Sequence, residues 1–443
     1  MPRQHEYAII GTGQRAGTYI DAITGPYRDV ARVAALCDPN PIRAAYHRTA
    51  YALSDVSVVT PDQFPDLLQR QQFDAVIVTS PDHTHDTYIC GALEAGVNVI
   101  SEKPMTTDAK RLRRIAAAVD RSSARLIVTF NYRYAPRNSA VKRLLSDGAI
   151  GTITSVHFEW LLDTSHGADY FRRWHRMKRN SGGLLVHKSS HHFDLVNWWL
   201  ADTPASVYAR GGLRFYGQDN AHRRGLGPRP RLGRDLPASD PFRLDLAADD
   251  RLRALFLDAE SADGYHRDTD VFNGDITIED SLSLLVEYER GATMTYSLNA
   301  FSPWEGYRVS FNGTGGRLEL DVVERSWVPE PNDQKHGGRV IDPSAERDPR
   351  ADTVGTRPEQ ERIRLQQLWE PAVDVPIPAG ATAHGGGDAL LLNELFRSPA
   401  DDPLNRAAGF QEGMRSLLVG IAANRSLEED RPVQISEFGF DVI

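Results

Sequence analysis

The chain has 443 residues, of which 41% are hydrophobic and 25% are charged, a composition typical of a globular protein. This length exceeds one ordinary hydrophobic core, so we expect two domains. The net charge of −9 excludes the broad basic surface that binding to nucleic acid or to an anionic membrane requires.

No apolar run approaches the roughly 20 residues that a membrane-spanning helix needs. The first strand begins almost at the N-terminus, so we expect no signal peptide. The two cysteines, Cys37 and Cys90, each lie inside an apolar stretch, which is typical of buried thiols in a reducing compartment. We therefore predict a cytoplasmic protein without a membrane or nucleic-acid partner.

Short apolar runs alternate with helical segments in the first third of the chain. The predicted strands are residues 7–10, 33–37, 75–78, 97–100 and 126–129. The predicted helices between them are residues 16–23, 88–95 and 112–119. Continuous apolar strands separated by helices indicate a parallel sheet that is covered on both faces.

The pattern changes after residue 131, where strands follow one another with few helices between them. The predicted strands are residues 152–162, 206–211, 276–288, 293–298, 307–312 and 316–320. The predicted helices are residues 139–145, 183–200, 389–396 and 409–423. We therefore predict an α/β protein whose second domain, residues 132–443, is α+β with a large, mostly antiparallel sheet for substrate binding and oligomerisation.

Two stretches of the second domain are rich in proline, glycine and charged residues. They cover residues 217–270 and 329–387, and we predict both as irregular excursions. Loops of this length act as lids, oligomer arms or linkers, and the sequence leaves these alternatives open.

Residues 11–16 read G-T-G-Q-R-A and fit the G-x-G-x-x-A form of the dinucleotide-binding fingerprint. The first glycine permits a tight turn, and the second lets the backbone approach a pyrophosphate at the helix N-terminus. A predicted strand precedes the turn and an amphipathic helix follows it, as the motif requires. We therefore predict a Rossmann-type nicotinamide-nucleotide domain over residues 1–131. Its predicted cofactor contacts at this turn are Gly11, Thr12, Gly13, Gln14 and Arg15.

The second predicted strand leads directly into Asp38. A carboxylate at this place accepts both ribose hydroxyls and repels a 2′-phosphate, which favours NAD over NADP as the cofactor. Alternatively, Asp38 caps the turn that follows it at Pro39-Asn40. Arg15 or Arg43 could also neutralise a 2′-phosphate, which leaves NADP as the second choice.

Residues 79–85 read T-S-P-D-H-T-H, and residues 101–104 read S-E-K-P after the next predicted strand. These segments resemble the T-P-x-x-x-H and E-K-P motifs of the Gfo/Idh/MocA family of sugar and polyol dehydrogenases. The resemblance continues into the second domain through the helix near His191 and the G-T-G-G-R-L-E-L segment at 313–320. It implies further cofactor contacts at Ser80, Pro81, His83, His85, Glu102, Lys103 and Asn131.

Lys103 stands just past the carboxyl end of a predicted parallel strand, and a proline follows it. The carboxyl ends of such strands converge on the cofactor crevice, so the lysine is expected beside the nicotinamide. Its ammonium can hydrogen-bond the reacting hydroxyl and stabilise developing alkoxide charge. The alternative is a surface lysine paired with Glu102.

His187, His191, Asp194 and Trp198 are spaced by four, three and four residues, so they share one face of the helix predicted over 183–200. The family resemblance implies that His191 is the proton acceptor, a role that suits the ordinary imidazole pKa of about 6.5. His-x-x-x-His is also a metal-binding spacing, but the glutamate of a zinc-protease helix is missing, so we predict no metal. His192 faces sideways and is interpreted as structural.

The chain departs from the family pattern at His187, where the family usually has aspartate, and Lys188 follows it. Residues 166–178 are also rich in aromatic and basic side chains, which pack on sugar rings and bind carboxylates, or alternatively form a surface ion-pair loop. We predict His187 as a third catalytic residue beside Lys103 and His191. The predicted substrate contacts are Lys103, Tyr132, Arg133, Tyr170, Trp174, His175, Arg176, His187, Lys188 and His191.

These features predict an NAD-dependent oxidoreductase that oxidises a secondary hydroxyl of a sugar, glycoside or cyclitol. The departure at His187 favours an alternative, a redox-neutral glycosidase that acts by transient ring oxidation, elimination and re-reduction. A non-catalytic cofactor-binding regulator is a third hypothesis, against which the presence of both Lys103 and His191 argues. The open sheet of the second domain predicts a homodimer or homotetramer.

Overall fold

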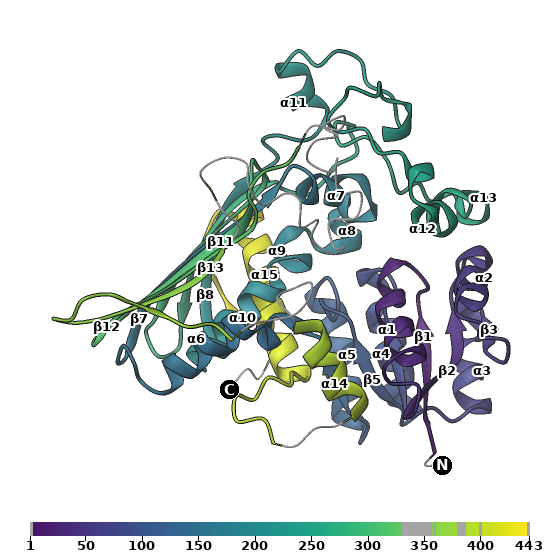
Figure 1. The fold of residues 1–443 in the computed structure, drawn as a ribbon, viewed down its shortest axis with the longest axis horizontal. Coiled ribbons are helices and arrows are strands. Elements are labelled where there is room, and N and C mark those ends of the chain that lie inside the picture. Colours follow the sequence, from purple (N-terminus) through teal and green to yellow (C-terminus); the bar gives the residue numbers. More distant parts are fainter. Residues whose placement is uncertain (1–2, 330–356, 358–359, 379–386, 398–400, 441–443) are drawn as a thin grey trace.

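The computed structural model describes residues 3–329, 357, 360–378, 387–397 and 401–440. The chain forms a nucleotide-binding-type α/β body from its first third and a large twisted sheet from the rest (Figure 1). None of the helices in the described ranges is both long and apolar enough to cross a membrane.

The first sheet has six strands in the order β3-β2-β1-β4-β5-β6, and every neighbouring pair is parallel. The strands are β1 (His5–Ile10), β2 (Ala31–Cys37), β3 (Ser57–Val59), β4 (Ala75–Val78), β5 (Asn98–Ser101) and β6 (Leu126–Val128). The predicted parallel sheet is therefore confirmed. The strand order reverses between β1 and β4, and ligands of such sheets bind at the carboxyl edge of this point.

Helices cover both faces of this sheet. They are α1 (Gln14–Thr24), α2 (Pro41–Ala50), α3 (Phe64–Arg70), α4 (His85–Glu94) and α5 (Ala109–Arg121). The sequence pattern does not reveal α2, because only Arg43, Ala44 and His47 of its ten residues are buried. Asn40 starts this helix, since its side chain accepts hydrogen bonds from the backbone N–H groups of Ile42 and Arg43.

The second sheet has nine strands in the order β14-β13-β12-β11-β7-β10-β9-β8-β15. They are β7 (Ile153–Asp163), β8 (Pro204–Gly212), β9 (Ser281–Tyr288), β10 (Thr293–Ser302), β11 (Glu305–Gly313), β12 (Gly316–Arg325), β13 (Gln360–Gln367), β14 (Val373–Val375) and β15 (Val433–Gln434). Only β7 and β10 pair in parallel among these described strands, so the prediction of a mostly antiparallel sheet is confirmed.

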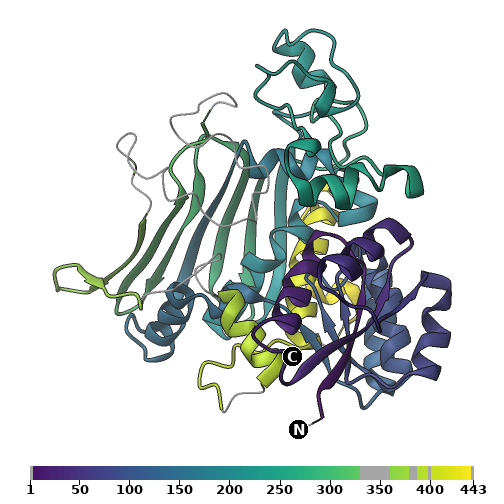
Figure 2. The same ribbon diagram turned by 45° about the vertical axis from the view of Figure 1, so that its right-hand side comes forward.

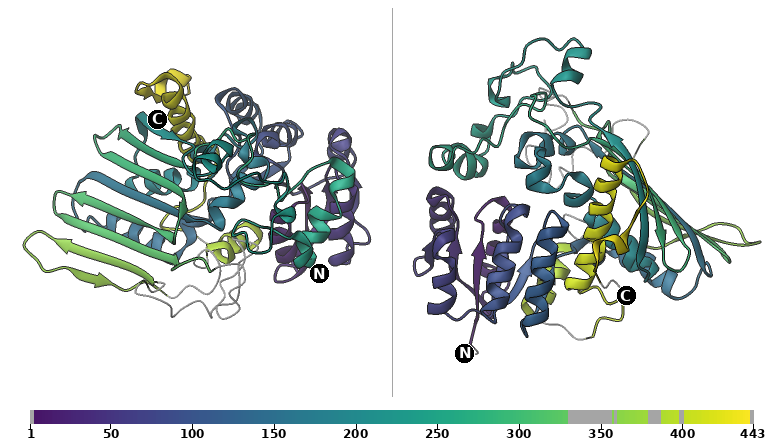
Figure 3. Two further views of the ribbon diagram at one scale, coloured as in Figure 1. Left: turned by 90° about the horizontal axis from the view of Figure 1, so that it is seen from above. Right: turned by 180° about the vertical axis from the view of Figure 1, so that it is seen from behind.

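The helices of the second body lie on the face of this sheet that is turned toward the first body (Figure 3). They include α6 (Pro136–Ser146), α10 (Ser190–Leu200) and α15 (Phe410–Glu429). Helix α15 contacts both α5 of the first body and β8 of the large sheet, so it joins the two bodies. The predicted C-terminal helices are confirmed as α14 (Gly387–Arg397) and α15.

Three predicted elements differ from the structure. The helix predicted over 183–200 is two helices, α9 (Leu184–His187) and α10, because the Ser189 hydroxyl bonds Tyr296 and the Ser189 carbonyl starts a new turn. The strand predicted over 276–288 begins only at Ser281.

The third difference lies in the excursion predicted over 329–387. Its residues 360–367 and 373–375 form β13 and β14 instead of irregular chain, with β14 at the edge of the sheet and β13 next to it. The polar composition concealed them, because these outer strands make few apolar contacts and only Ile363 of β13 is buried. Residues 330–356, 358–359 and 379–386 of this prediction lie outside the described residues.

The excursion over 217–270 is built from short helical turns. They are α11 (Gln218–Arg223), η5 (Gly233–Asp235), η6 (Leu246–Ala248), α12 (Asp250–Leu252), η7 (Arg253–Leu257) and α13 (Glu260–Asp263). The excursion leaves the large sheet, and its second half returns across the molecule to α2 (Figure 2). It therefore contacts the first body, which the sequence did not indicate.

Candidate active site

The glycine turn between β1 and α1 has the geometry of a dinucleotide cradle. Gly11 has φ of +85°, and a Cβ there would lie 2.5 Å from the Ser80 Cα, so this turn requires glycine. Gly13 is the N-cap of α1, no side chain caps that helix, and a Cβ at Gly13 would meet nothing within 4 Å. The N–H groups of the first turn of α1 thus suit a pyrophosphate, and the residues present fit a dinucleotide cofactor.

Asp38 lies at the end of β2 and joins two turns. Its Oδ2 accepts a hydrogen bond from the Thr12 N–H at 2.6 Å, and its Oδ1 accepts one from the Asn40 N–H at 2.7 Å. The interpretation of Asp38 as a turn cap is therefore confirmed. A carboxylate oxygen accepts more than one hydrogen bond, so contact with a ribose is compatible with these bonds and stays a prediction.

Glu102 faces α1 and pairs with Arg15 rather than with Lys103. Its Oε1 accepts hydrogen bonds from Arg15 Nε at 2.5 Å and from the Tyr19 hydroxyl at 2.7 Å. Burial alone would raise the pKa of Glu102, but the Arg15 guanidinium holds it below its usual range. The alternative in which Lys103 is a surface lysine paired with Glu102 is wrong.

Lys103 projects from the turn after β5 toward the second body. Its Nζ donates a hydrogen bond to the backbone carbonyl of His187 at 3.1 Å. Burial lowers the pKa of Lys103 to about 8, although the Asp82 carboxyl opposes this shift. A lysine with such a pKa exchanges its proton near neutral pH, as an acid–base or charge-stabilising group requires.

His85 holds the two neighbouring turns of the crevice together. Its ring nitrogens lie 2.8 Å from the carbonyl oxygen of Pro104 and 2.7 Å from that of Ser80. The Ser80 hydroxyl in turn bonds Thr84. His85 is 1% exposed, so the structure places it as a support for the Lys103 turn.

Asp82 and His187 form a pair that the sequence alone did not reveal. The Asp82 Oδ2 and the His187 Nδ1 are 2.5 Å apart, although 105 positions separate the two residues. Burial raises the pKa of Asp82, and burial together with the Lys103 charge lowers the pKa of His187. Asp82 lies within the 79–85 segment that resembles the family motif, and this position was the sequence feature that could have indicated its place in the site.

Three of the predicted substrate contacts surround His187. The ring centroids of His175 and Tyr170 lie 4.3 Å and 5.5 Å from that of His187. Trp174 stacks on His175 at 3.6 Å. The structure thus brings these aromatic side chains next to the Asp82–His187 pair, as the composition of residues 166–178 indicated.

His191 and Lys188 meet at Tyr132. The imidazole of His191 stacks on the Tyr132 ring with centroids 4.5 Å apart. The Lys188 Nζ lies 3.4 Å from the Tyr132 hydroxyl and 4.8 Å from the centre of the Trp160 ring. Lys188 is 5% exposed, and burial lowers its pKa. These contacts bring three predicted substrate residues together at the inner face of the large sheet.

Other predicted site residues have partners elsewhere. Arg133 makes a bidentate ion pair with Asp194 at 2.6 and 2.7 Å, so its donors point into the protein. Arg176 pairs with Asp275, and Asn131 donates to Asp388. Asn131 is thereby linked to the Arg15–Glu102 pair, because Asp388 also lies 3.9 Å from Arg15. His83 lies one residue beyond Asp82 and is partly buried.

The predicted common face of the histidine helix is divided by the break at Ser189. His187 meets Asp82, whereas Asp194 is 1% exposed and lies against Arg133. His192 bonds the Tyr296 hydroxyl inside the core, as its structural interpretation requires. Within the described ranges, no three His, Cys, Asp or Glu side chains converge closely enough to hold a metal ion.

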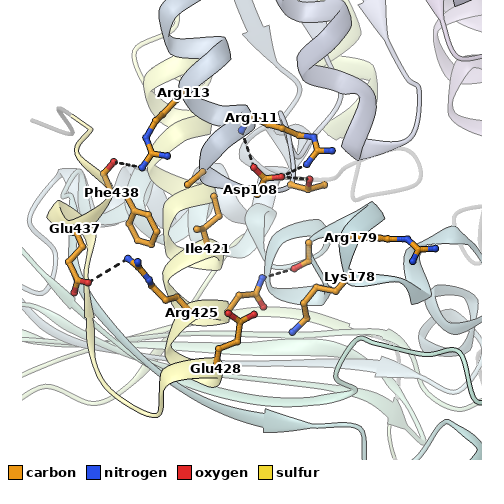
Figure 4. Close-up of a pocket in the computed structure, with 14 residues that line it drawn as sticks. Asp108, Arg111, Arg113, Lys178, Arg179, Ile421, Arg425, Glu428, Glu437 and Phe438 are labelled. Atoms are coloured by element: carbon orange, nitrogen blue, oxygen red, sulfur yellow. Dashed lines mark hydrogen bonds and ion pairs between the residues drawn. The ribbon is translucent and has the colours of Figure 1, made fainter.

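A groove of about 600 Å³ lies between α5, α8 (Lys178–Ser181) and α15 (Figure 4). Lys103, His187 and His191 are not among the residues that line it. Charged side chains of both signs line it, and several pair with one another. Arg111 pairs with Asp108, and Arg425 with Glu437. The contacts of Lys103 and His187 lie outside this groove, so we assign it no chemistry.

Two family models cover most of the chain. The model of the oxidoreductase-family NAD-binding Rossmann fold matches residues 5–130, and that of the C-terminal alpha/beta domain of the same family matches residues 142–435. The chain belongs to the Gfo/Idh/MocA oxidoreductase family. The family resemblance of the sequence is thereby confirmed.

Relatives are similar over different shares of the chain. The oxidoreductase YteT of Bacillus subtilis is 36% identical over 428 residues, which are 91% of each protein. Inositol 2-dehydrogenase of Rhizobium meliloti is 29% identical over 207 residues, which are 47% of this chain and 58% of that enzyme. The crystal structure of the WlbA dehydrogenase of Bordetella pertussis with NADH and UDP-GlcNAcA has a TM-score of 0.61 and 18% identity over 98% of this chain and 99% of that one.

These matches establish the family and the fold. This Gfo/Idh/MocA chain is an oxidoreductase-family protein with a nicotinamide-nucleotide domain and a mostly antiparallel second domain. Its substrate is a separate question, since the inositol dehydrogenase aligns with only about half of it.

Proposed function

We propose that this family member oxidises a secondary hydroxyl of a sugar, glycoside or cyclitol with NAD. The observation that carries the proposal is the position of Lys103 at the carboxyl edge of the parallel sheet. It bonds the backbone of His187, and the His187 imidazole pairs with Asp82. A family of oxidoreductases that includes inositol dehydrogenases supports it.

The reaction removes a hydrogen from carbon with its electron pair and a proton from the hydroxyl. The bound nicotinamide supplies the acceptor of that electron pair. The Lys103 ammonium donates a hydrogen bond to the reacting oxygen and stabilises the negative charge that develops there. His191 accepts the hydroxyl proton, and Tyr170 and Trp174 pack against the carbon skeleton of the substrate.

The direct test is a panel of cyclitols, aldoses and alkyl glycosides incubated with NAD. We expect one equivalent of NADH and one of ketone or lactone for each substrate molecule consumed. Absence of NADH formation with every member, despite NAD binding, would contradict the proposal.

The preference for NAD has support from two arginines. Arg43 lies 3.6 Å from Asp38 and 2.6 Å from Asp263, and Arg15 pairs with Glu102, so carboxylates already engage both candidate partners of a 2′-phosphate. We expect NAD to bind at least about tenfold more tightly than NADP. Fluorescence titration with both reduced nucleotides measures the ratio, and equal affinities would refute it.

The pKa of Lys103 gives a pH prediction. Its ammonium is lost as the pH rises through about 8, so kcat/KM for oxidation should fall above that pH. Arginine keeps its charge, so Lys103→Arg should remove this decline even if its rate is lower. A wild-type profile that stays level up to about pH 10 would show that no lysine ammonium is needed.

A second candidate function is the redox-neutral glycosidase. The Asp82–His187 pair favours it, because elimination next to a ring ketone needs a proton acceptor in addition to the one that serves the hydroxyl. In this cycle the leaving group departs, water adds and the ketone is reduced again. Release of the aglycone from aryl glycosides without NADH accumulation would support it, whereas NADH in step with ketone supports simple oxidation.

We also propose a homodimer or homotetramer in the cytoplasm. Alternate residues of β9 are exposed, including Leu285 at 48%, which leaves an apolar side chain on the outer face of the sheet for a second copy to cover. Cys37 and Cys90 are buried free thiols, which suits a reducing compartment. Sedimentation measurements at several protein concentrations test the assembly.

A further inference from the structure

The segment of residues 244–265 contacts the first body at the two turns that follow β1 and β2. The Asn40 amide donates to the carbonyl of Ala259 at 2.9 Å. Arg43 donates to the carbonyl of Leu255 at 3.1 Å and to the Asp263 carboxylate at 2.6 Å. Both residues belong to the turn and helix that come directly after Asp38.

The same segment also reaches the first turn of α1. Arg251 donates to the carbonyl oxygen of Gln14 at 3.4 Å. The Arg251 guanidinium occupies the space that a side chain at residue 17 would need. A Cβ added to Gly17 would lie 1.9 Å from the Arg251 Nη2 atom. The glycine therefore permits close contact between this arginine and the helix whose N-terminus faces the predicted pyrophosphate.

Apolar packing supports these polar contacts. Leu244, Leu246, Leu252, Leu255 and Phe256 form a hydrophobic cluster of their own, separate from the main core. Tyr46 of α2 packs against this cluster, and the Arg43 guanidinium lies 6.0 Å from the centre of the Phe256 ring. The segment is thus a folded unit seated on α2.

The chain directly after the segment is fixed to the second body, near the aromatic side chains around His187. Arg267 is fully buried and pairs with Asp169 of α7 (His166–Arg172) at 2.7 Å. Arg234 bonds Asp268 and pairs with Glu260 of α13. The segment itself contacts the first body, and the chain directly after it is held in the second body through Arg267, so the segment connects the two bodies (Figure 2).

The bridge covers the adenosine side of the crevice. Thr12 and Asn40 are fully buried, and Asp38 is 6% exposed. The acidic residue at the end of the second strand marks the adenosine ribose in a Rossmann domain, and the first turn of α1 marks the pyrophosphate. The segment bonds the backbone or side chains beside both places.

We propose that residues 244–265 are a cofactor clamp, which closes over the adenosine half of the dinucleotide and holds it through many turnovers. This inference rests on the nicotinamide nucleotide of the proposed function. Arg251 and Asp263 are the clamp side of the contact, and Gln14 and Arg43 are its partners on the first body. Release of the dinucleotide requires these contacts to open, so the clamp sets the dissociation rate.

Slow release has a consequence for the net reaction. In net oxidation NADH must leave before the next cycle, so opening of the clamp limits the rate at which NADH appears. In the redox-neutral alternative the ketone intermediate takes back the electron pair and a proton, and the dinucleotide stays bound.

The test measures nucleotide retention in the full-length protein. We expect the purified wild type to carry close to one nicotinamide nucleotide per chain, detected by absorbance and chromatography after denaturation. Displacement of bound NADH by excess NAD, followed by fluorescence, should show a dissociation rate at least about tenfold lower than in the Arg251→Ala/Asp263→Asn variant, which loses two charged contacts. Arg253→Ala is the matched control, since Arg253 is an exposed arginine of the same segment whose ion pair, with Asp258, stays within it.

The possible outcomes separate the clamp from the proposed function. Rapid release by the wild type, at the rate of the double variant, would overturn the clamp and leave the oxidoreductase proposal standing. Failure of NAD and NADP to bind the wild type at all would overturn both. Hydrogen exchange gives a measurement that needs no variant, because NAD should slow exchange of backbone amides in residues 250–263, and unchanged exchange there would also overturn the clamp.

Discussion

Lys103→Ala is expected to lower kcat for oxidation by about 100-fold or more, the effect of removing a charge-stabilising donor from a buried site. The ammonium donates to the carbonyl of His187 at 3.1 Å in a partly buried site, and burial lowers its pKa. The substrate and the nucleotide should still bind, because the substitution removes an interaction that strengthens only as alkoxide charge develops.

The measurement is kcat and KM on the best polyol of the panel, together with NADH affinity by fluorescence. Lys142→Ala is a suitable control, since Lys142 is another partly buried lysine whose ammonium donates to a backbone carbonyl, that of Trp198, within the second body. A Lys103→Ala enzyme with turnover within a few-fold of the control would refute the catalytic assignment.

The features that the sequence predicted correctly are those set by contiguous residues. The turn at Gly11 and Gly13 follows from local backbone geometry, since Gly11 has φ of +85°, which favours glycine. Lys103 follows from its place after a parallel strand, because the carboxyl edge of such a sheet is where ligands bind. Both the glycine turn and Lys103 could therefore be predicted from short sequence motifs.

The features that the sequence missed depend on contacts between distant segments. A helical spacing shows that His187 and Asp194 share a face, but it does not show what that face meets. The break at Ser189 directs His187 toward Asp82, and Asp194 lies against Arg133. The contact of Arg251 with α1 spans 237 positions and has no signature in composition, which is why the excursion gave no sign of its role.

The Asp82–His187 pair explains how the chain accommodates its departure from the family. At position 187, where the family resemblance implies an aspartate, this protein has an imidazole, and the turn after β4 places the Asp82 carboxyl group 2.5 Å from it. The first body therefore supplies the carboxyl group that contacts His187.

His187→Asp should consequently inactivate the enzyme, with a loss of about 100-fold or more in kcat/KM. The variant would place two carboxyl groups in contact at a buried position, and repulsion would force one of them to remain protonated. Adding Asp82→Asn removes the repulsion and keeps a hydrogen-bonding partner, so the double variant should recover at least about tenfold of the lost activity.

The comparison needs all three variants and a control on an exposed histidine. His157→Asp on β7 serves this purpose, since His157 is exposed and its imidazole bonds only the neighbouring Thr295 hydroxyl in the described contacts. If His187 were only a packing residue, Asp82→Asn would not restore activity to His187→Asp, and the two losses would add. Recovery by the second substitution is therefore the result that distinguishes a working acid–base pair from a structural one.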